Sequence, residues 1–335
     1  MKFMWQWAVM IFASAALCSV AEARCTINAA GLTVSPATVN TGTFTPPGTP
    51  STVTVTFNVS GTYNSTTATR PTCGLAIAFN RGSIPASMTR TTGGATMSYT
   101  VLSGASSLLY TGGAPTTAQT VQTTFNQAGT NLTNQPFTAT LSVNFLASPS
   151  TPQGAGSYSD SLTLNTFYVR VGGGTAGAMT ALTSTPFTVT ATVNKACTIG
   201  GVATPAADSA TIPVSTTGTV TTTAIPKSYA TVVCNVLSNV QVSSLSGAVK
   251  SAATAPSGFT NLINYSASAI YSGATSTLNT ATVATAAGVE LGTSATTTSA
   301  TSSGTLSVTI TPQTPTLKLI KDSYSDTLRI TITPQ

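Results

Sequence analysis

Few residues of this sequence have side chains suited to chemistry, and four cysteines are the most conspicuous of them. Beyond the first 24 residues the chain contains Cys25, Cys73, Cys197 and Cys234, an even number at wide spacings. Such a set forms disulfides in an exported protein, whereas in the cytosol it more often binds metal or takes part in catalysis. The compartment of the protein therefore decides what these cysteines do.

The N-terminus has the three parts of an export signal. Lys2 precedes an apolar run over residues 5–20, which is followed by an A-x-A cleavage site at residues 21–23. The run is too short for a membrane-spanning helix, and no later stretch is apolar over the roughly 18 residues that a bilayer requires. We expect residues 1–23 to be a signal peptide and the mature chain to begin at Arg24, exported and soluble.

Export favours disulfides over metal ligation. Four cysteines permit three pairings, and the spacing favours Cys25 with Cys73 and Cys197 with Cys234, because one pair then lies near the start of each half of the chain. In the chain-entropy estimate, closing loops of this size stabilises each half by roughly 4 kcal/mol. We expect a structural role for all four cysteines.

The remaining candidates for chemistry do not form a recognisable active site. The sequence has no histidine, which is the commonest general base and metal ligand. It has no G-x-S-x-G, S-x-x-K or Walker-type motif, and Gly93-Gly94 and Gly172–Gly174 lack the lysine and helix of a phosphate loop. We expect a non-enzymatic protein without cofactor or metal; a glycosidase-like carboxylate pair is the alternative. The carboxylates of the mature chain are Asp160, Asp208, Glu290, Asp322 and Asp326.

Composition indicates a folded β-protein. Charged residues make up only 5% of the chain and hydrophobic residues 41%, which is not the composition of a disordered protein. The rest is rich in Thr and Ser, and the many β-branched residues favour strands. The net charge of +6 is dispersed, with only Lys318 and Lys321 close together, so we expect no nucleic-acid binding.

The chain contains an internal repeat. Cys25-Thr26-Ile27 recurs as Cys197-Thr198-Ile199, and the stretch from Tyr158 to Leu162 recurs from Tyr324 to Leu328 as Tyr-Ser-Asp-x-Leu. The intervals between the two motifs are similar in both halves. The sequence therefore predicts one domain type used twice.

Between these landmarks apolar residues alternate with Thr or Ser, as in a strand with one buried face. No stretch shows sustained helical periodicity. The fold class predicted is all-β, with two tandem immunoglobulin-like antiparallel β-sandwiches. The alternating residues include Val53, Val55, Phe57, Val59, Leu141, Val143, Leu162, Leu164, Leu306, Val308, Ile310, Leu328, Ile330 and Ile332.

The two halves differ at their ends. The N-terminal domain, residues 24–185, is followed by a strand-like linker at residues 186–195 that leads into the C-terminal domain, residues 196–335. We expect the C-terminal domain to be one strand short, which would expose an apolar groove and two unpaired edges to a strand from another chain. The alternative is a shorter domain whose own loops cover the edge. The linker alternates through Phe187, Val189, Ala191 and Val193.

These motifs resemble the spore coat protein U domain, the pilin-like module of archaic (Csu-type) chaperone–usher pili. The resemblance rests on the Cys-Thr-Ile starts, on the alternating run before Lys195-Ala196-Cys197, and on the Tyr-Ser-Asp-x-Leu strands. It implies incomplete sandwiches that a periplasmic chaperone holds and an outer-membrane usher assembles. In the fibre, the N-terminal extension of a neighbouring pilin would fill the groove.

Within that family the chain resembles the two-domain tip adhesin. Only Arg24 precedes Cys25 after the expected cleavage, so the chain would accept a strand without donating one; cleavage near Ala13 or Ala16 would leave a short extension instead. The run from Phe187 to Val193 would complete the N-terminal domain as a self-complementing strand. The implied location is a pilus on the cell surface, or the medium, and the implied role is attachment and biofilm formation.

Attachment to an abiotic or host surface would require exposed apolar loops on the N-terminal domain. Three short apolar stretches beside Gly, Ser or Pro are candidates, and the alternative for each is a strand end packed in the core. The candidate residues are Phe44, Pro46, Pro47, Leu108, Leu109, Tyr110, Phe145 and Leu146.

Two other functions are compatible with the sequence. One is a structural subunit of a pilus shaft or of a spore or surface coat, with no adhesive role. The other is a soluble carbohydrate-binding module.

Overall fold

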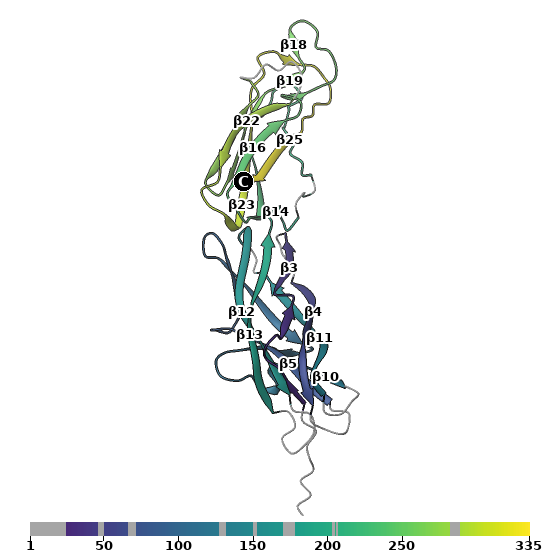
Figure 1. Cartoon of the computed structure of the whole chain (residues 1–335). Coiled ribbons are helices and arrows are strands. Elements are labelled where there is room, and N and C mark those ends of the chain that lie inside the picture. Colours follow the sequence, from purple (N-terminus) through teal and green to yellow (C-terminus); the bar gives the residue numbers. More distant parts are fainter. Residues whose placement is uncertain are drawn as a thin grey trace, which may run out of the picture.

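The computed structural model describes residues 25–45, 50–65, 72–126, 132–149, 153–169, 178–202, 205, 207–281 and 289–335. Their regular structure is β-strand apart from one 3-10 turn, η1 (Thr117–Gln119). Two β-rich domains lie end to end in an elongated molecule (Figure 1). The all-β prediction is confirmed. No helix in the described ranges is long and apolar enough to cross a bilayer.

The N-terminal domain is one continuous hydrogen-bonded sheet that folds over on itself. Its main path is β1-β4-β11-β7-β6-β12-β13-β3, and β5 pairs with both β12 and β10. The strands are β1 (Cys25–Ile27), β2 (Thr33–Ser35), β3 (Thr38–Phe44), β4 (Ser51–Ser65), β5 (Thr72–Asn80), β6 (Ser87–Arg90), β7 (Thr96–Ser103), β8 (Ser106–Ser107), β9 (Leu109–Tyr110), β10 (Val121–Asn126), β11 (Leu132–Ser148), β12 (Gly156–Val169) and β13 (Met179–Val193).

Four phenylalanine rings form the centre of this domain. Phe57 of β4, Phe79 of β5, Phe145 of β11 and Phe187 of β13 are almost fully buried. The Phe187 ring lies 5.4 Å from those of Phe57 and Phe79 and 5.6 Å from that of Phe145. Rings at such distances attract one another beyond the area that they bury. The cluster therefore ties β13 to strands from distant parts of the chain.

The strand β13 extends through the predicted boundary at residue 185. It pairs with β12 in antiparallel register from Met179 to Val193, and its other edge pairs in parallel with β3. Residues 186–193 of the predicted linker are thus part of the N-terminal sheet. Only residues 194–196 join this sheet to the next domain.

The C-terminal domain is a smaller sandwich. A five-stranded sheet in the order β14-β15-β23-β20-β21 faces a three-stranded sheet in the order β22-β16-β25, and two short pairs, β17-β19 and β18-β24, lie beside them. The strands are β14 (Cys197–Ile199), β15 (Ile225–Cys234), β16 (Ser238–Ser244), β17 (Val249–Lys250), β18 (Phe259–Thr260), β19 (Leu262–Ile263), β20 (Tyr265–Tyr271), β21 (Ala274–Asn279), β22 (Glu290–Thr296), β23 (Thr301–Pro312), β24 (Lys318–Leu319) and β25 (Leu328–Pro334).

Each domain contains one disulfide, in the pairing that the spacing predicted. Cys25 is bonded to Cys73, which links β1 to β5, and Cys197 is bonded to Cys234, which links β14 to β15. The bonds close loops of 48 and 37 residues. Both therefore restrict the unfolded chain of their own domain.

One asparagine connects the two domains. Asn235 is only 3% exposed, and its side-chain amide donates to the carbonyl oxygens of Asn194, at 2.8 Å, and Gln153, at 3.1 Å. Its side-chain oxygen accepts from the backbone N–H of Ala196 at 2.8 Å. The segment before β12, the joining segment and the end of β15 thus meet at one side chain, which we call the Asn235 joint.

Candidate functional site

The repeated aspartates occupy equivalent positions in the two domains. Asp160 accepts a hydrogen bond from the hydroxyl of Tyr99 at 2.7 Å, and Asp326 accepts one from the hydroxyl of Tyr265 at 2.5 Å. Both tyrosines are buried, and this burial, assisted by the hydrogen bond to the carboxylate, raises their pKa values. The repeat therefore aligns β12 with β25.

The other partners of the two aspartates differ. Arg81 donates its Nε–H to Asp160 at 2.6 Å and forms an ion pair with it. Asp326 instead accepts from the Ser244 hydroxyl at 2.6 Å and the Ser246 backbone N–H at 3.0 Å. Both carboxylates are thus satisfied by hydrogen bonds within their own domain, which gives them structural roles.

The strand that contains Asp160, β12, and the strand that follows Asp326, β25, have different neighbours. In the N-terminal domain, β12 pairs with β13 along one edge and with β5 and β6 along the other. In the C-terminal domain, β25 pairs with β16 along one edge, and no strand among the described residues pairs with its second edge. An open strand edge of this kind is a template for pairing with a further strand.

The apolar side chains of β12 and β25 also differ in how deeply they are buried. Leu162 and Leu164 of β12 are 3% and 1% exposed, whereas the equivalent residues Leu328 and Ile330 of β25 are only half-buried. The apolar side of β25 is therefore incompletely covered. It contributes to a groove instead of a closed core.

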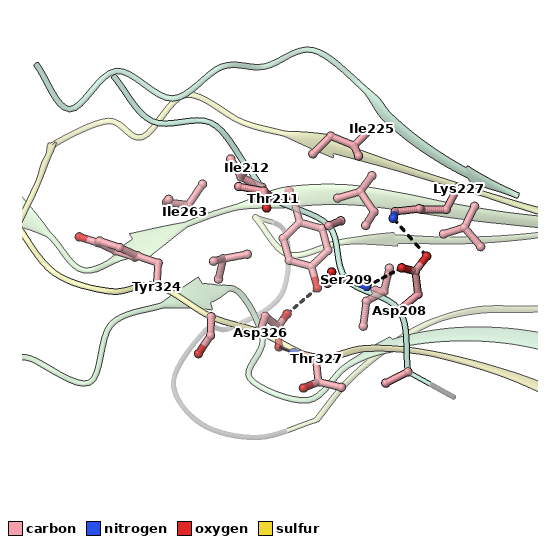
Figure 2. Close-up of a pocket in the computed structure, with 18 of the residues that line it drawn as sticks. Asp208, Ser209, Thr211, Ile212, Ile225, Lys227, Ile263, Tyr324, Asp326 and Thr327 are labelled. Atoms are coloured by element: carbon pink, nitrogen blue, oxygen red, sulfur yellow. Dashed lines mark hydrogen bonds and ion pairs between the residues drawn. The ribbon is translucent and has the colours of Figure 1, made fainter. Parts of the chain in front are cut away.

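The groove has a volume of about 560 Å³ and lies between β15 and β25 (Figure 2). The edge of β15 that faces away from β23 is covered by β14 only from Val232 to Cys234, so the portion from Ile225 to Tyr229 has no strand on that side within the described chain. Apolar side chains that line the groove are Ile212, Ile225, Val249, Ile263, Val308, Ile310, Leu328 and Ile330.

The groove is thus an apolar trough flanked by two open strand edges. Such an arrangement can bind an extended peptide, which gains backbone hydrogen bonds at its edges and buries alternate side chains. The predicted groove and open edges of the C-terminal domain are present. The described residues contain no cluster of His, Cys, Asp or Glu that could hold a metal ion.

The prediction that Leu108, Leu109 and Tyr110 form an exposed loop is wrong. They are 0%, 3% and 4% exposed. Leu109 and Tyr110 form β9, which pairs in parallel with β5, and the Phe79 backbone N–H donates to the Leu108 carbonyl at 3.0 Å. This pairing across a long stretch of sequence is what buries them.

The other candidate loop residues are also not exposed where the structure describes them. Phe145 is fully buried in the aromatic cluster, and Phe44 is 5% exposed at the end of β3, beside β13. Leu146 is half-buried within β11. Pro46 and Pro47 lie outside the described residues.

Sequence reasoning did not identify several side chains of the groove. Residues 207–212 line it although they belong to no strand, and Lys227 and Tyr229 lie at its edge. The alternation in β15, from Ile225 through Lys227 to Tyr229, was the available signal. A lysine at an alternating position, however, is typical of the solvent-facing side of a strand, so the pattern does not indicate a groove.

Comparisons with known proteins give no family. No family model matches this sequence, so the resemblance to the spore coat protein U domain has no support of that kind. No curated protein matches it either.

Among the solved structures that match this chain are three of pilus or fimbrial tip subunits. The chaperone–tip adhesion subunit pre-assembly complex CsuC–CsuE of Acinetobacter baumannii matches at a TM-score of 0.40, with 13% identity over 92% of this chain and 100% of that one. The CupB6 tip adhesin of Pseudomonas aeruginosa matches at 0.32, with 11% identity over 93% and 95%. CfaE, the adhesive subunit of the CFA/I fimbria of enterotoxigenic Escherichia coli, matches at 0.27, with 12% identity over 89% and 93%.

Proposed function

We propose that this protein is a strand-accepting subunit of a chaperone–usher surface fibre, in which it occupies the tip and mediates attachment. The observation that carries the proposal is the open edge of β25 beside an apolar groove. The equivalent strand β12 has that edge filled by β13. The two domains thus provide a filled and an unfilled version of the same site.

The filled version indicates what would occupy the unfilled one. In the N-terminal domain, Leu162 lies opposite Phe187 and Asp160 lies opposite Val189. By the repeat, Leu328 and Asp326 would lie opposite a large apolar residue and a β-branched one. The occupant would therefore be a strand antiparallel to β25 with apolar residues at alternate positions.

The N-terminal domain has no need of such an occupant. Its strand β13 is paired on both edges, and the inward side chains of Phe187, Val189, Ala191 and Val193 are at most 2% exposed. We infer that β13 completes this domain from within the chain. The domain is then free to present its surface at the end of a fibre.

The proposed partners follow from the resemblance and from the groove. They are a periplasmic chaperone, an outer-membrane usher, a neighbouring pilin that donates its strand, and an abiotic or host surface. Export through the predicted signal peptide would bring the chain to the periplasm and then to the pilus. Because Phe44, Phe145 and residues 108–110 are buried, other residues of the N-terminal domain would contact the surface.

A self-complemented variant tests the groove. Since Tyr158 aligns with Tyr324, Val169 aligns with Gln335, and a copy of residues 170–193 placed after Gln335 would reproduce the β12–β13 hairpin. We expect the copy to raise the free energy of unfolding of the C-terminal domain by several kcal/mol, because burying one large apolar side chain contributes about 1.5–3 kcal/mol. Urea denaturation measures the change.

The matched control carries the same copy, but serine replaces the phenylalanine and the valine that copy Phe187 and Val189. It should leave stability near that of the parent chain. If the unmodified copy also leaves the C-terminal domain unchanged and remains open to protease, the groove is not a strand-accepting site.

Position on the fibre separates the tip proposal from the structural alternative. Immunogold electron microscopy with antibody against residues 24–185 should place label at fibre ends. Label along the shaft would indicate a repeating structural subunit. Label without fibres would indicate a coat or secreted binding protein.

A further inference from the structure

A segment without regular structure lies along the groove of the C-terminal domain. Residues 207–214, which we call the strap, supply seven of its lining residues, from Ala207 through Ile212 and then Val214. Figure 2 shows Asp208 and Ser209 near Lys227, with Thr211 and Ile212 further along the pocket. Ile212 is half-buried, whereas residues 207–211 are exposed. The strap therefore rests on the groove without entering the core.

The strap is not held there by a strand ladder. No backbone group of residues 207–212 forms a hydrogen bond with the backbone of another described residue. The Ser209 backbone N–H donates to the side chain of its own neighbour, Asp208, at 2.7 Å. Residues 207–212 can therefore leave the groove without breaking a backbone pairing of the described chain, while Pro213 and Val214 stay paired with Thr221 and Val220.

Side-chain contacts of Asp208 hold the strap against β15. Its carboxylate lies 3.1 Å from the ammonium group of Lys227 and accepts a hydrogen bond from the Tyr229 hydroxyl at 3.3 Å. Lys227 and Tyr229 belong to the portion of β15 that has the open edge. The side chains of Asp208 and Lys227 are 44% and 29% exposed, so water screens the pair and it breaks readily.

We propose that the strap covers the empty groove and that Asp208 is its latch, which must release before a strand can enter. The inference rests on the proposed strand-accepting function and adds a control of access to it. The strap lines the groove beside the open portion of β15, where the incoming strand would lie, so the covered and filled states would exclude one another. Covering the groove then lowers the apparent affinity and the association rate by the same factor.

Breaking the latch should raise the rate at which a strand binds the groove and leave the rate at which it dissociates unchanged. The Asp208→Asn variant keeps the shape of the side chain but removes its charge, so the strap would leave the groove more often. We expect the association rate of a labelled peptide copying residues 185–195 to rise roughly twofold to fivefold, the range for an exposed ion pair. The dissociation rate should not change, because the latch is already open in the filled state.

The measurement is stopped-flow fluorescence on the full chain. Glu290→Gln, which removes a carboxylate from β22 away from the groove, is the matched control and should bind like the parent. The double variant Asp208→Lys with Lys227→Asp restores opposite charges and should return the rate toward that of the parent. The single variant Asp208→Lys should bind the peptide faster than the parent does.

Each result is decisive. Equal association rates for the parent and Asp208→Asn, with measurable binding in both, would overturn the proposal that the strap controls access. The proposal that the groove accepts a strand would stand. A change confined to the dissociation rate would also overturn it, because Asp208 would then contact the bound strand. If neither the parent nor any variant binds the peptide, the proposed strand-accepting function is wrong, and so is the proposed role of the strap.

Discussion

At the scale of single residues, the two aspartates of the repeat show how one motif is adapted to two surroundings. Each aspartate accepts a hydrogen bond from a buried tyrosine, but Asp160 is also paired with Arg81, whereas Asp326 also accepts from Ser244 and Ser246. Because buried hydroxyls need partners, the aspartate is required in both domains. Its role is to fix a tyrosine of the core.

The first prediction concerns this role. Asp326→Ala leaves the hydroxyl of Tyr265 without its acceptor, and we expect it to lower the free energy of unfolding of the C-terminal domain by about 1–3 kcal/mol. Urea denaturation measures the loss. In a Tyr265→Phe background the same substitution should cost less. An equal cost in both backgrounds would show that the tyrosine is not what Asp326 serves.

The second prediction concerns the pH dependence of the latch. The hydrogen bond from Lys227, followed by that from the Ser209 backbone, lowers the pKa of Asp208. A carboxylate with a lowered pKa contributes its stability above its unfolded pKa, near 3.9, and loses it as the pH falls through the folded value. The difference in stability between the parent and Asp208→Asn should therefore be constant near neutral pH and shrink in acid.

Denaturant titrations between acid and neutral pH measure this difference. Tyr229 and Lys227 are the other titratable groups that contact Asp208. Burial raises the pKa of the Tyr229 hydroxyl, so it stays neutral in that range. A difference that stays constant into strong acid would mean that the carboxylate makes no favourable contact.

At the scale of elements, the short strand β9 buries an apolar stretch that the sequence suggested was an exposed loop. Leu108, Leu109 and Tyr110 lie between Ser and Gly residues, a context typical of loops. Pairing with β5 places them in the core, and the Tyr110 hydroxyl accepts a hydrogen bond from Asn165 at 2.5 Å. These residues stabilise the fold and are not available for contact with a surface.

The third prediction follows from that burial. Leu108→Ala and Leu109→Ala should each lower the free energy of unfolding of the N-terminal domain by roughly 2–5 kcal/mol, as cavities in a core do. Ile84→Ala, at a residue that is 50% exposed, is the control and should change stability by no more than about 0.5 kcal/mol. Unaltered stability for both leucine variants would return these residues to the list of candidates for attachment.

At the scale of the whole molecule, the Asn235 joint links the two domains through hydrogen bonds. Only residues 194–196 connect the two sheets, yet the side chain of Asn235 bonds to backbone groups on both sides of the junction. A joint of this kind favours one orientation over a freely bending linker. The two domains lie end to end (Figure 1), and a stiff junction would keep the N-terminal domain extended from a fibre.

The fourth prediction tests the joint. Asn235→Ala removes three hydrogen bonds at the junction, so the domains should sample more orientations. Small-angle X-ray scattering should show a broader distribution of interatomic distances than for the parent. Asn194→Ala is the matched control, because Asn194 contributes its backbone carbonyl to the joint and its side chain bonds elsewhere. An unchanged distribution for Asn235→Ala would assign the rigidity to other contacts.

Local patterns in the sequence predicted much of this protein. The alternation of apolar and polar residues gave the strands, and the repeated motifs gave two domains of one type. The spacing of the cysteines gave both disulfides. These features depend on residues close in sequence, or on copies of one motif, so they can be recognised without coordinates.

Only the tertiary structure decided which apolar stretches are buried and what lines the groove. Leu109 is covered because β9 returns to pair with β5, and Asp208 lies near Lys227 because the strap folds back along β15. The residues around each member of such a contact do not indicate which distant residue it will meet. The burial of a side chain is a property of what the rest of the chain places against it, and that is set by packing across the whole domain.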